Sequence, residues 1–370
     1  MKVDHRHRET SWTTEHRHAP WPRGCDTDAD GALTLHGVRL DSLAAAWGTP
    51  LWVVDEPAFM HGVDELIQIR GARPLVGAGP LALQTTRWAQ ARGWDVWGDR
   101  ARLAHAQVLT ASPQRLMLDL RGQLRSETIG AARSRLVVNA RNLDLELLER
   151  AAARSVYLNI DGISNRELGQ VLARLAARSR ELPPLAGLAW RLDTETPVTA
   201  RDRVGAAFDA VSAVVATSGR LVVDGGVHPD PLPVLRALLD RTVGPGHNAV
   251  VSSLLADLSA WLLRRASLAL VRVDSVQGLA ARQVIGLSGG APTAMATSVR
   301  AVLPTLGSPR PTLLVWPNGR TLMTEGHELL APGDVLAVPG VSSSPGLCVV
   351  VGADGVAVSA TGSLSSPGEP

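Results

Sequence analysis

A histidine close to two aspartates is the group in this sequence best suited to acid–base chemistry. His228 follows the turn Gly225-Gly226, and Asp224 and Asp230 lie near it in the chain. An imidazole titrates near neutral pH, so such a group can take up and return a proton. The alternative interpretation is a polar loop histidine ahead of a helix that begins near Pro231. The sequence leaves both interpretations open.

The amino-terminal arm carries a second group of chemically able side chains, in two His-x-His pairs: His5, His7, His16 and His18. Imidazoles at this density can bind zinc, copper or nickel. No cysteine or carboxylate at a firm spacing completes a rigid site, and arms of this composition are often simply solvated. We therefore expect no metal.

The composition excludes several classes of protein. The 370 residues carry a net charge of +2 from 37 basic and 35 acidic residues spread along the chain, which gives no nucleic-acid signature. No apolar run reaches the ~18 residues of a membrane span, and the amino terminus lacks the apolar core of a secretory signal. Cys25 and Cys348 suggest neither a disulfide nor a thiolate site. We expect a cytoplasmic protein with no membrane or nucleic-acid partner.

Repeated βα units should position the candidate residues. Between about residues 73 and 253, short apolar runs alternate with amphipathic stretches such as 143–153, 166–177 and 200–216. The candidate parallel strands are RPLVGA, WDVWG, RLMLDL, RLVVN, VYLNI, LAGLAWRL, RLVVDGG and HNAVVSS. Eight such strands predict a (β/α)8 barrel, whose active site would lie at the carboxyl ends of the strands.

The remaining chain predicts a second domain. After about Ala266 the helical pattern fades, and β-like segments separated by Pro, Gly and Ser indicate a mostly antiparallel β domain. The expected boundaries are a disordered arm at 1–28, a segment packing with the β domain at 29–58, the barrel at 59–265, the β domain at 266–360 and a disordered tail at 361–370.

Two anchors give a resemblance to a known family. Trp47–Asp55 reads WGTPLWVVD and Pro332–Ala337 reads PGDVLA. With the order of segments from about Leu33 to Val358, they resemble the diaminopimelate, ornithine and arginine decarboxylases. The resemblance implies an alanine-racemase-type barrel joined to a β domain, with pyridoxal phosphate held as a Schiff base by a lysine on the first barrel strand.

The residue at the position of that lysine is Gly77, in the stretch PLVGAGP. Glycine offers no amine, and the only lysine in the chain is Lys2, in the arm. Arg191 falls where the family has a histidine that stacks on the cofactor ring. By resemblance, then, a working pyridoxal-phosphate decarboxylase is not expected, while non-covalent pyridoxal phosphate stays open.

Other family positions have also changed. Asp224-Gly225-Gly226 replaces the glycine triplet that cradles the cofactor phosphate, and a carboxylate there would face an anion. Asp257 aligns with the glutamate that pairs with the pyridine nitrogen. In the β domain, Val315–Arg320 and Ser342–Ser344 replace residues that the family supplies across its dimer interface.

Three hypotheses follow. The first is a degenerate, non-catalytic pseudoenzyme that acts as a partner or regulatory subunit, as a homodimer or as a heterodimer with a catalytic paralogue. The second is an enzyme independent of pyridoxal phosphate, working in amino-acid-derived or specialised metabolite biosynthesis at the same barrel mouth, with these candidates: Arg191, Asp193, Asp224, His228 and Asp257. The third is a small-molecule sensor or carrier that binds phosphate at Gly225-Gly226. Trp190 and Trp316 could fill a vacated cofactor pocket.

Overall fold

The structure is a computed structural model of the chain. It describes residues 21–77, 82–98, 115–121, 135–151, 153–193, 195–212, 219–225, 228–240, 251–279, 282–288, 299–305, 310–327, 330–340 and 347–359. The predictions made for the His-rich arm, for Lys2, Gly226 and Ser342–Ser344, and for the tail fall outside these residues.

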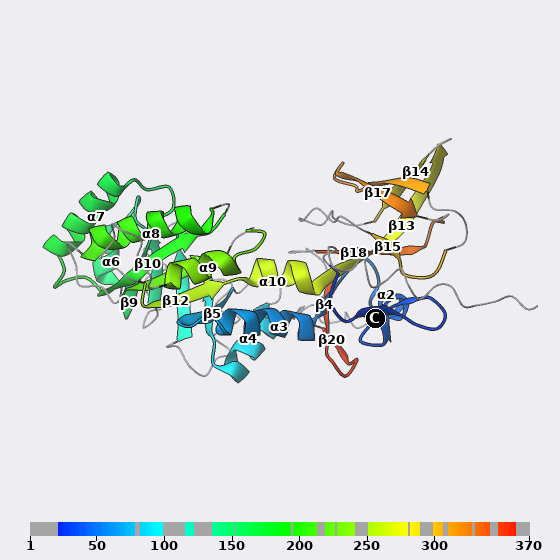
Figure 1. Ribbon diagram of the computed structural model, residues 1–370, viewed down its shortest axis with the longest axis horizontal. Coiled ribbons are helices and arrows are strands. Elements are labelled where there is room, and N and C mark those ends of the chain that lie inside the picture. Colours follow the sequence, from blue (N-terminus) through cyan, green and yellow to red (C-terminus); the bar gives the residue numbers. More distant parts are fainter. Residues whose placement is uncertain are drawn as a thin grey trace, which may run out of the picture. The chain divides into compact units, whose positions relative to one another are not determined.

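The chain divides into two compact units. One comprises Met1–Gly62 with Leu262–Pro370, and the other comprises Val63–Trp261. The divisions fall within two helices, α3 (Glu56–Ile67) and α10 (Ser259–Ala266) (Figure 1).

The second unit is a closed barrel of eight parallel strands. In chain order the strands are β5 (Ala72–Gly77), β6 (Asp95–Gly98), β7 (Leu116–Leu120), β8 (Arg135–Asn139), β9 (Ser155–Asn159), β10 (Leu185–Arg191), β11 (Arg220–Asp224) and β12 (Ser253–Asp257). The helices between them are α4 (Ala82–Arg92), α6 (Leu145–Arg150), α7 (Asn165–Ala177), α8 (Pro197–Ser212) and α9 (Leu232–Leu239). The predicted barrel is confirmed.

One predicted strand was misplaced. HNAVVSS was expected to form the eighth strand, but β12 begins at Ser253, and residues 251–252 precede it. The reason is pairing: Leu254, Leu255 and Ala256 are buried and lie in register with β11 on one side and β5 on the other. The shift puts Asp257 at the carboxyl end of a barrel strand.

Inward-facing side chains fill the barrel in a layer to which each strand contributes one residue: Leu75, Trp97, Met117, Val137, Tyr157, Ala189, Val222 and Leu255. Side chains alternate along a strand, so residues two positions later face the same way. On the described strands these are Gly77, Asp119, Asn139, Asn159, Arg191, Asp224 and Asp257. These mostly polar residues therefore form a ring above the apolar core of the barrel, and we call this ring the mouth ring.

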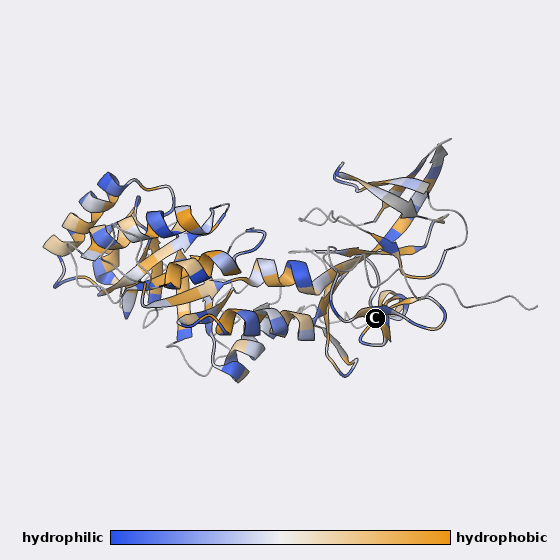
Figure 2. Ribbon diagram, in the orientation of Figure 1, coloured by the Kyte–Doolittle hydropathy of each residue, from blue (hydrophilic) through white to orange (hydrophobic). Residues whose placement is uncertain are grey.

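The helices around the barrel are amphipathic. Along α7, Leu168, Val171 and Leu172 are buried, and hydrophobic and hydrophilic residues alternate along its ribbon (Figure 2). A capping box between Ser164 and Glu167 fixes where α7 begins.

The first unit contains a mixed, mostly antiparallel sheet in the order β17-β16-β14-β13-β4-β19-β20, with β18 paired to β13 and β15 paired to β18. Its strands are β4 (Leu51–Asp55), β13 (Ser267–Leu279), β14 (Arg282–Leu287), β15 (Arg300–Ala301), β16 (Arg310–Val315), β17 (Thr321–His327), β18 (Val335–Pro339), β19 (Leu347–Val351) and β20 (Ala357–Ser359). A small sheet of β1 (Cys25–Thr27), β2 (Leu33–Leu35) and β3 (Val38–Arg39) leads into α2 (Leu40–Trp47). Among the described helices, none is long and apolar enough to cross a membrane.

Candidate functional site

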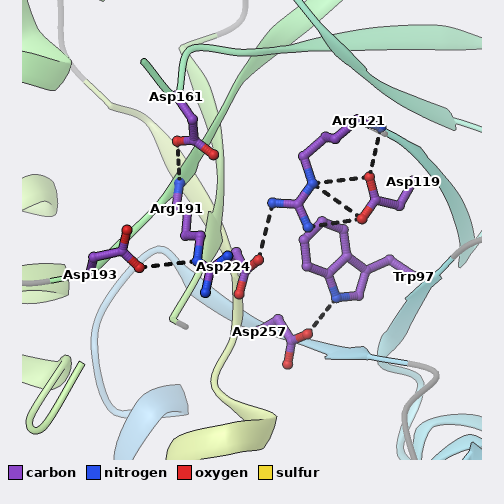
Figure 3. Close-up of polar contacts among 8 residues, drawn as sticks. All are labelled: Trp97, Asp119, Arg121, Asp161, Arg191, Asp193, Asp224 and Asp257. Atoms are coloured by element: carbon purple, nitrogen blue, oxygen red, sulfur yellow. Dashed lines mark hydrogen bonds and ion pairs between the residues drawn. The ribbon is translucent and has the colours of Figure 1, made fainter. Parts of the chain in front are cut away.

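Arg121 organises the charges at the carboxyl end of the barrel (Figure 3). Just after β7, its Nε donates to both oxygens of Asp119 at 3.0 and 3.1 Å, and one terminal nitrogen donates to Asp119 Oδ2 at 2.8 Å. The other terminal nitrogen donates to Asp224 Oδ2, at the end of β11, at 3.0 Å. Burial disfavours the charge on Arg121, but the bonds to Asp119 and Asp224 outweigh it and raise the pKa of the guanidinium.

Trp97 connects this cluster to Asp257. The guanidinium carbon of Arg121 lies 4.6 Å from the centroid of the Trp97 ring, within cation–π range. The indole nitrogen of Trp97 donates to Asp257 Oδ2 at 2.5 Å (Figure 3). Asp257 Oδ1 accepts from the backbone N–H of Ser259 at 2.9 Å, so both carboxylate oxygens have donors.

Gly77 lies directly against this carboxylate. A Cβ atom added at Gly77 would lie 2.6 Å from Asp257 Oδ2 and 3.5 Å from the indole nitrogen of Trp97. Gly77 does not have a positive φ, so its backbone conformation alone would accept other residues. The absence of a side chain at Gly77 is thus matched to the position of Asp257, which takes up the space that any side chain there would enter.

Two carboxyl groups near the mouth ring have raised pKa values. Burial raises the pKa of Asp257, the negative charge of Asp224 adds to the shift, and bonds from Ser259 and Trp97 oppose it. Burial also raises the pKa of Asp161, against hydrogen bonds from the Arg191 backbone and the Asn159 side chain. Asp161 interacts electrostatically with Arg121 and Asp224, so these residues form one electrostatic unit.

The turn after β11 packs closely against the chain that follows β12. The N–H of Gly225 donates to the backbone oxygen of Asp257 at 2.7 Å. A Cβ atom at Gly225 would lie 2.6 Å from Leu258 Cδ2 and 2.8 Å from that same oxygen. Close approach to the chain after β12 therefore accounts for this glycine, and its amide is not directed at a ligand.

His228 is held by the backbone on both sides of its ring. Its Nδ1 accepts from the N–H of Asp230 at 3.1 Å, and Nε2 lies 3.2 Å from the carbonyl oxygen of Glu195. Since Nδ1 accepts, Nε2 carries the proton that reaches the carbonyl. The ring is buried and in this arrangement ties two loops together, which matches the loop interpretation of this histidine.

Arg191 and Asp193 lie at the outer side of the cluster. Arg191 Nε donates to Asp193 at 3.0 Å, and both side chains are about half exposed. The backbone N–H of Arg191 donates to Asp161 at 2.8 Å. Trp190 turns away from the mouth ring: it lies between the inward positions of β10, and Arg203 of α8 lies 6.0 Å from its ring centroid. Trp97, and not Trp190, is the tryptophan at the mouth.

Pyridoxal phosphate does not fit these residues. Gly77 supplies no amine, and the Asp257 carboxylate stands at its Cα. The N–H of Gly225 is bonded to the backbone oxygen of Asp257 and is not available to a phosphate, and the neighbouring carboxylate of Asp224 is paired with Arg121. Among the described residues, no group of three or more His, Cys, Asp or Glu side chains could hold a metal ion.

The mouth ring brings together some of the residues expected from sequence and adds others. Gly77, Asp224 and Asp257 meet there with Trp97, Asp119 and Arg121, which were not singled out as site residues (Figure 3). The available signal was the position of Asp119 and Arg121: polar residues at the end of a buried strand, the edge where barrel enzymes place their chemistry.

Solved structures provide the comparisons. No known protein-family profile matches the sequence, and no curated protein does either. A protein of Aquifex aeolicus superposes with a TM-score of 0.71 at 15% identity, covering 91% of this chain and 94% of that one. A diaminopimelate decarboxylase of M. jannaschii, in complex with L-lysine, gives 0.69 at 13% identity, covering 91% and 94%.

A Vibrio vulnificus lysine/ornithine decarboxylase, complexed with cadaverine, gives a TM-score of 0.65 at 14% identity, covering 90% of this chain and 96% of that one. At these identities the likeness establishes the fold and leaves the activity open. The chain therefore has the barrel-plus-β-domain fold of the pyridoxal-phosphate-dependent diaminopimelate, arginine and lysine/ornithine decarboxylases.

Proposed function

We propose that this chain is a degenerate member of the decarboxylase fold that runs no Schiff-base chemistry and acts as a non-catalytic partner or regulatory subunit. The observation that carries the proposal is the pairing of Gly77 with Asp257. A glycine in place of the lysine removes the nucleophile, and a partly buried carboxylate 2.6 Å from the position of a Cβ atom uses the space. The two features together support a site whose other residues have changed to match the loss of the lysine.

The bonds among the central side chains at the barrel mouth support the same proposal. Arg121 is bonded to Asp119 and Asp224, and Trp97 is bonded to Asp257. A catalytic site needs groups directed at a substrate, whereas these groups are directed at one another. We further propose a cytoplasmic protein that forms a homodimer, or a heterodimer with a catalytic paralogue, because such a subunit acts through association.

The experiment combines catalysis with association. The purified full chain, with added pyridoxal phosphate, is assayed for carbon dioxide release from diaminopimelate, lysine, ornithine and arginine. It is then mixed with a catalytic decarboxylase of the same fold from the same genome, and mass is followed by light scattering. We expect no release by the chain alone and a mixed dimer with altered turnover. Release by the chain alone, lost in Asp257→Ala, would refute the proposal.

The raised pKa of Asp257 favours a second candidate function. A carboxyl group that holds its proton above the ordinary range, at the carboxyl end of a barrel, is suited to general acid–base work. Asp224 lies beside Asp257 in register on the neighbouring strand. The two carboxyl groups differ in environment, because Asp224 is paired with Arg121 and Asp257 accepts a hydrogen bond from Trp97. This is the enzyme independent of pyridoxal phosphate, and turnover without the cofactor that is abolished in Asp257→Asn would identify it.

A further inference from the structure

The amino end of the barrel carries an arginine at the start of strand after strand. Along the chain, Arg73, Arg92, Arg115, Arg135 and Arg154 follow one another at intervals of 19, 23, 20 and 19 residues. Each lies within three residues of the first residue of a strand, from β5 to β9. Parallel strands of a closed barrel begin at the same end, so charges that are spread along the sequence gather on one face.

The same face is completed by Arg70, two residues before β5, and by Arg220, the first residue of β11. We call its exposed members the arginine face: Arg70, Arg73, Arg92, Arg115, Arg154 and Arg220. We define a strand start as the residues from three before to one after the first residue of a barrel strand. Among the described residues of these strand starts, Asp95 is the one acidic side chain.

The Asp95 carboxylate is already engaged. It is buried and accepts a hydrogen bond from Arg135 at 2.9 Å, and a terminal nitrogen of Arg73 lies 4.0 Å from its other oxygen. Within the described part of the chain, no other member of the arginine face is paired with a carboxylate. These exposed guanidinium groups therefore repel one another and create a positive potential at this end of the barrel.

Helix dipoles do not account for the arginine face. The carboxyl end of a helix favours a nearby cation, but only within its last turn. In the arginine face only Arg92 lies in the last turn of a helix, α4. The others lie in strands or in the loops that lead into them.

We propose that the arginine face binds an acidic segment of a partner protein, rich in Asp and Glu side chains. A guanidinium group is exposed, always charged and shaped to bind a carboxylate through two parallel N–H donors. The barrel mouth, where Figure 3 shows five aspartates and two arginines, would repel such a segment. The arginine face thus gives the proposed regulatory subunit a surface for association, and the inference rests on the proposed function for the kind of partner alone.

A nucleic acid is the other polyanion that arginines bind, and the described strand starts favour it less. Proteins that bind single strands combine basic grooves with exposed aromatic rings on which bases stack. The aromatic ring of these strand starts nearest in sequence to an exposed arginine is Trp94, beside Arg92, and it is buried. Side chains that would stack on bases are therefore not displayed there.

The test measures fluorescence anisotropy of a labelled short peptide of alternating Glu and Ser, titrated with the full chain at low salt. A peptide of alternating Gln and Ser is the neutral control, and a single-stranded oligothymidylate of equal charge is the nucleic-acid probe. The first variant combines Arg115→Gln, Arg154→Gln and Arg220→Gln. The matched variant combines Arg23→Gln, Arg166→Gln and Arg272→Gln, three exposed arginines outside the arginine face, and so removes the same charge.

We expect saturable binding of the Glu peptide, weaker by about fivefold or more in the first variant and by about twofold or less in the matched variant. Equal weakening in both variants would reduce the effect to net charge and overturn the inference, as would no saturable binding. Tighter binding of the oligothymidylate than of the Glu peptide would assign the face to nucleic acid instead. Should the first variant fail to fold, the single substitutions Arg154→Gln and Arg166→Gln replace the two combinations.

The two proposals fail in distinguishable ways. Absence of Glu-peptide binding, in a chain that also forms no adduct with pyridoxal phosphate, overturns the role of the arginine face and leaves the proposed function intact. A covalent adduct with pyridoxal phosphate overturns the proposed function, whatever the chain does with the Glu peptide.

Discussion

Adding a single methyl group at Gly77 tests the arrangement at the barrel mouth. In Gly77→Ala the new Cβ atom would lie 2.6 Å from Asp257 Oδ2, where ordinary contacts lie at 3.4–4 Å. Asp257 cannot withdraw freely, because both of its carboxylate oxygens accept hydrogen bonds, from Trp97 and from Ser259. We therefore expect Gly77→Ala to destabilise the barrel, although its backbone conformation would accept alanine.

The magnitude follows from two costs. Overpacking of a filled site costs about 1–3 kcal/mol. Displacing Asp257 far enough to break its bond with Trp97 leaves a buried donor unsatisfied, at about 1–3 kcal/mol. Since partial movement exchanges one cost for the other, we expect a loss of about 1–3 kcal/mol. In a barrel of this size that lowers the unfolding midpoint by roughly 2–12 °C.

The assay is thermal unfolding followed by tryptophan fluorescence, with two controls. In Gly77→Ala combined with Asp257→Ala the clash is absent, so the alanine at 77 should cost nothing relative to Asp257→Ala alone. Gly169→Ala, in helix α7 with nothing within 4 Å of an added Cβ atom, should stabilise by about 0.5–1 kcal/mol. Equal destabilisation by Gly77→Ala in both backgrounds would refute the role given to Asp257.

Two further predictions concern charge at the mouth. Arg121→Ala leaves the partly buried Asp119 and Asp224 without their cation and should cost about 1–3 kcal/mol in urea unfolding. The half-exposed pair removed in Arg191→Ala should cost less than about 0.5 kcal/mol, and equal losses would contradict the account. The raised pKa of Asp257 makes the folded chain hold its proton more tightly than the unfolded chain. Stability should fall as pH rises from the ordinary value of 3.8 through the raised value. Asp257→Asn should flatten that fall, and an unchanged slope would count against the buried carboxyl.

Much of the fold could be predicted from the sequence, because strands buried on both faces read as short apolar runs between amphipathic helices. Seven strands of the barrel coincide with predicted runs. The eighth was misplaced because two apolar pairs flank Ser252 and Ser253. Hydrophobic periodicity does not distinguish the two pairs of apolar residues. Only the hydrogen bonding of the second pair to strands β5 and β11 shows that this pair forms the strand.

The candidate site was less accessible to sequence reasoning. The loss of the lysine at Gly77 could be read directly, but the close approach of Asp257 to Gly77 joins residues 180 positions apart along the chain. Trp97 belongs to the apolar run WDVWG and lies in the buried layer of the barrel, and its bond to Asp257 depends on closure of the barrel. His228 had the right neighbours in sequence, yet its ring is directed at the backbone of Asp230 and Glu195.

The most direct test of the central claim is the intact mass of the full chain after incubation with equimolar pyridoxal phosphate and reduction with borohydride, with Lys2→Arg measured in parallel. The structure predicts an unchanged mass, because Gly77 offers no amine and Asp257 Oδ2 takes up the space of a side chain at that position. A stoichiometric reduced adduct that disappears in Lys2→Arg would contradict the account, since it would mean that the chain retains Schiff-base chemistry through its only lysine.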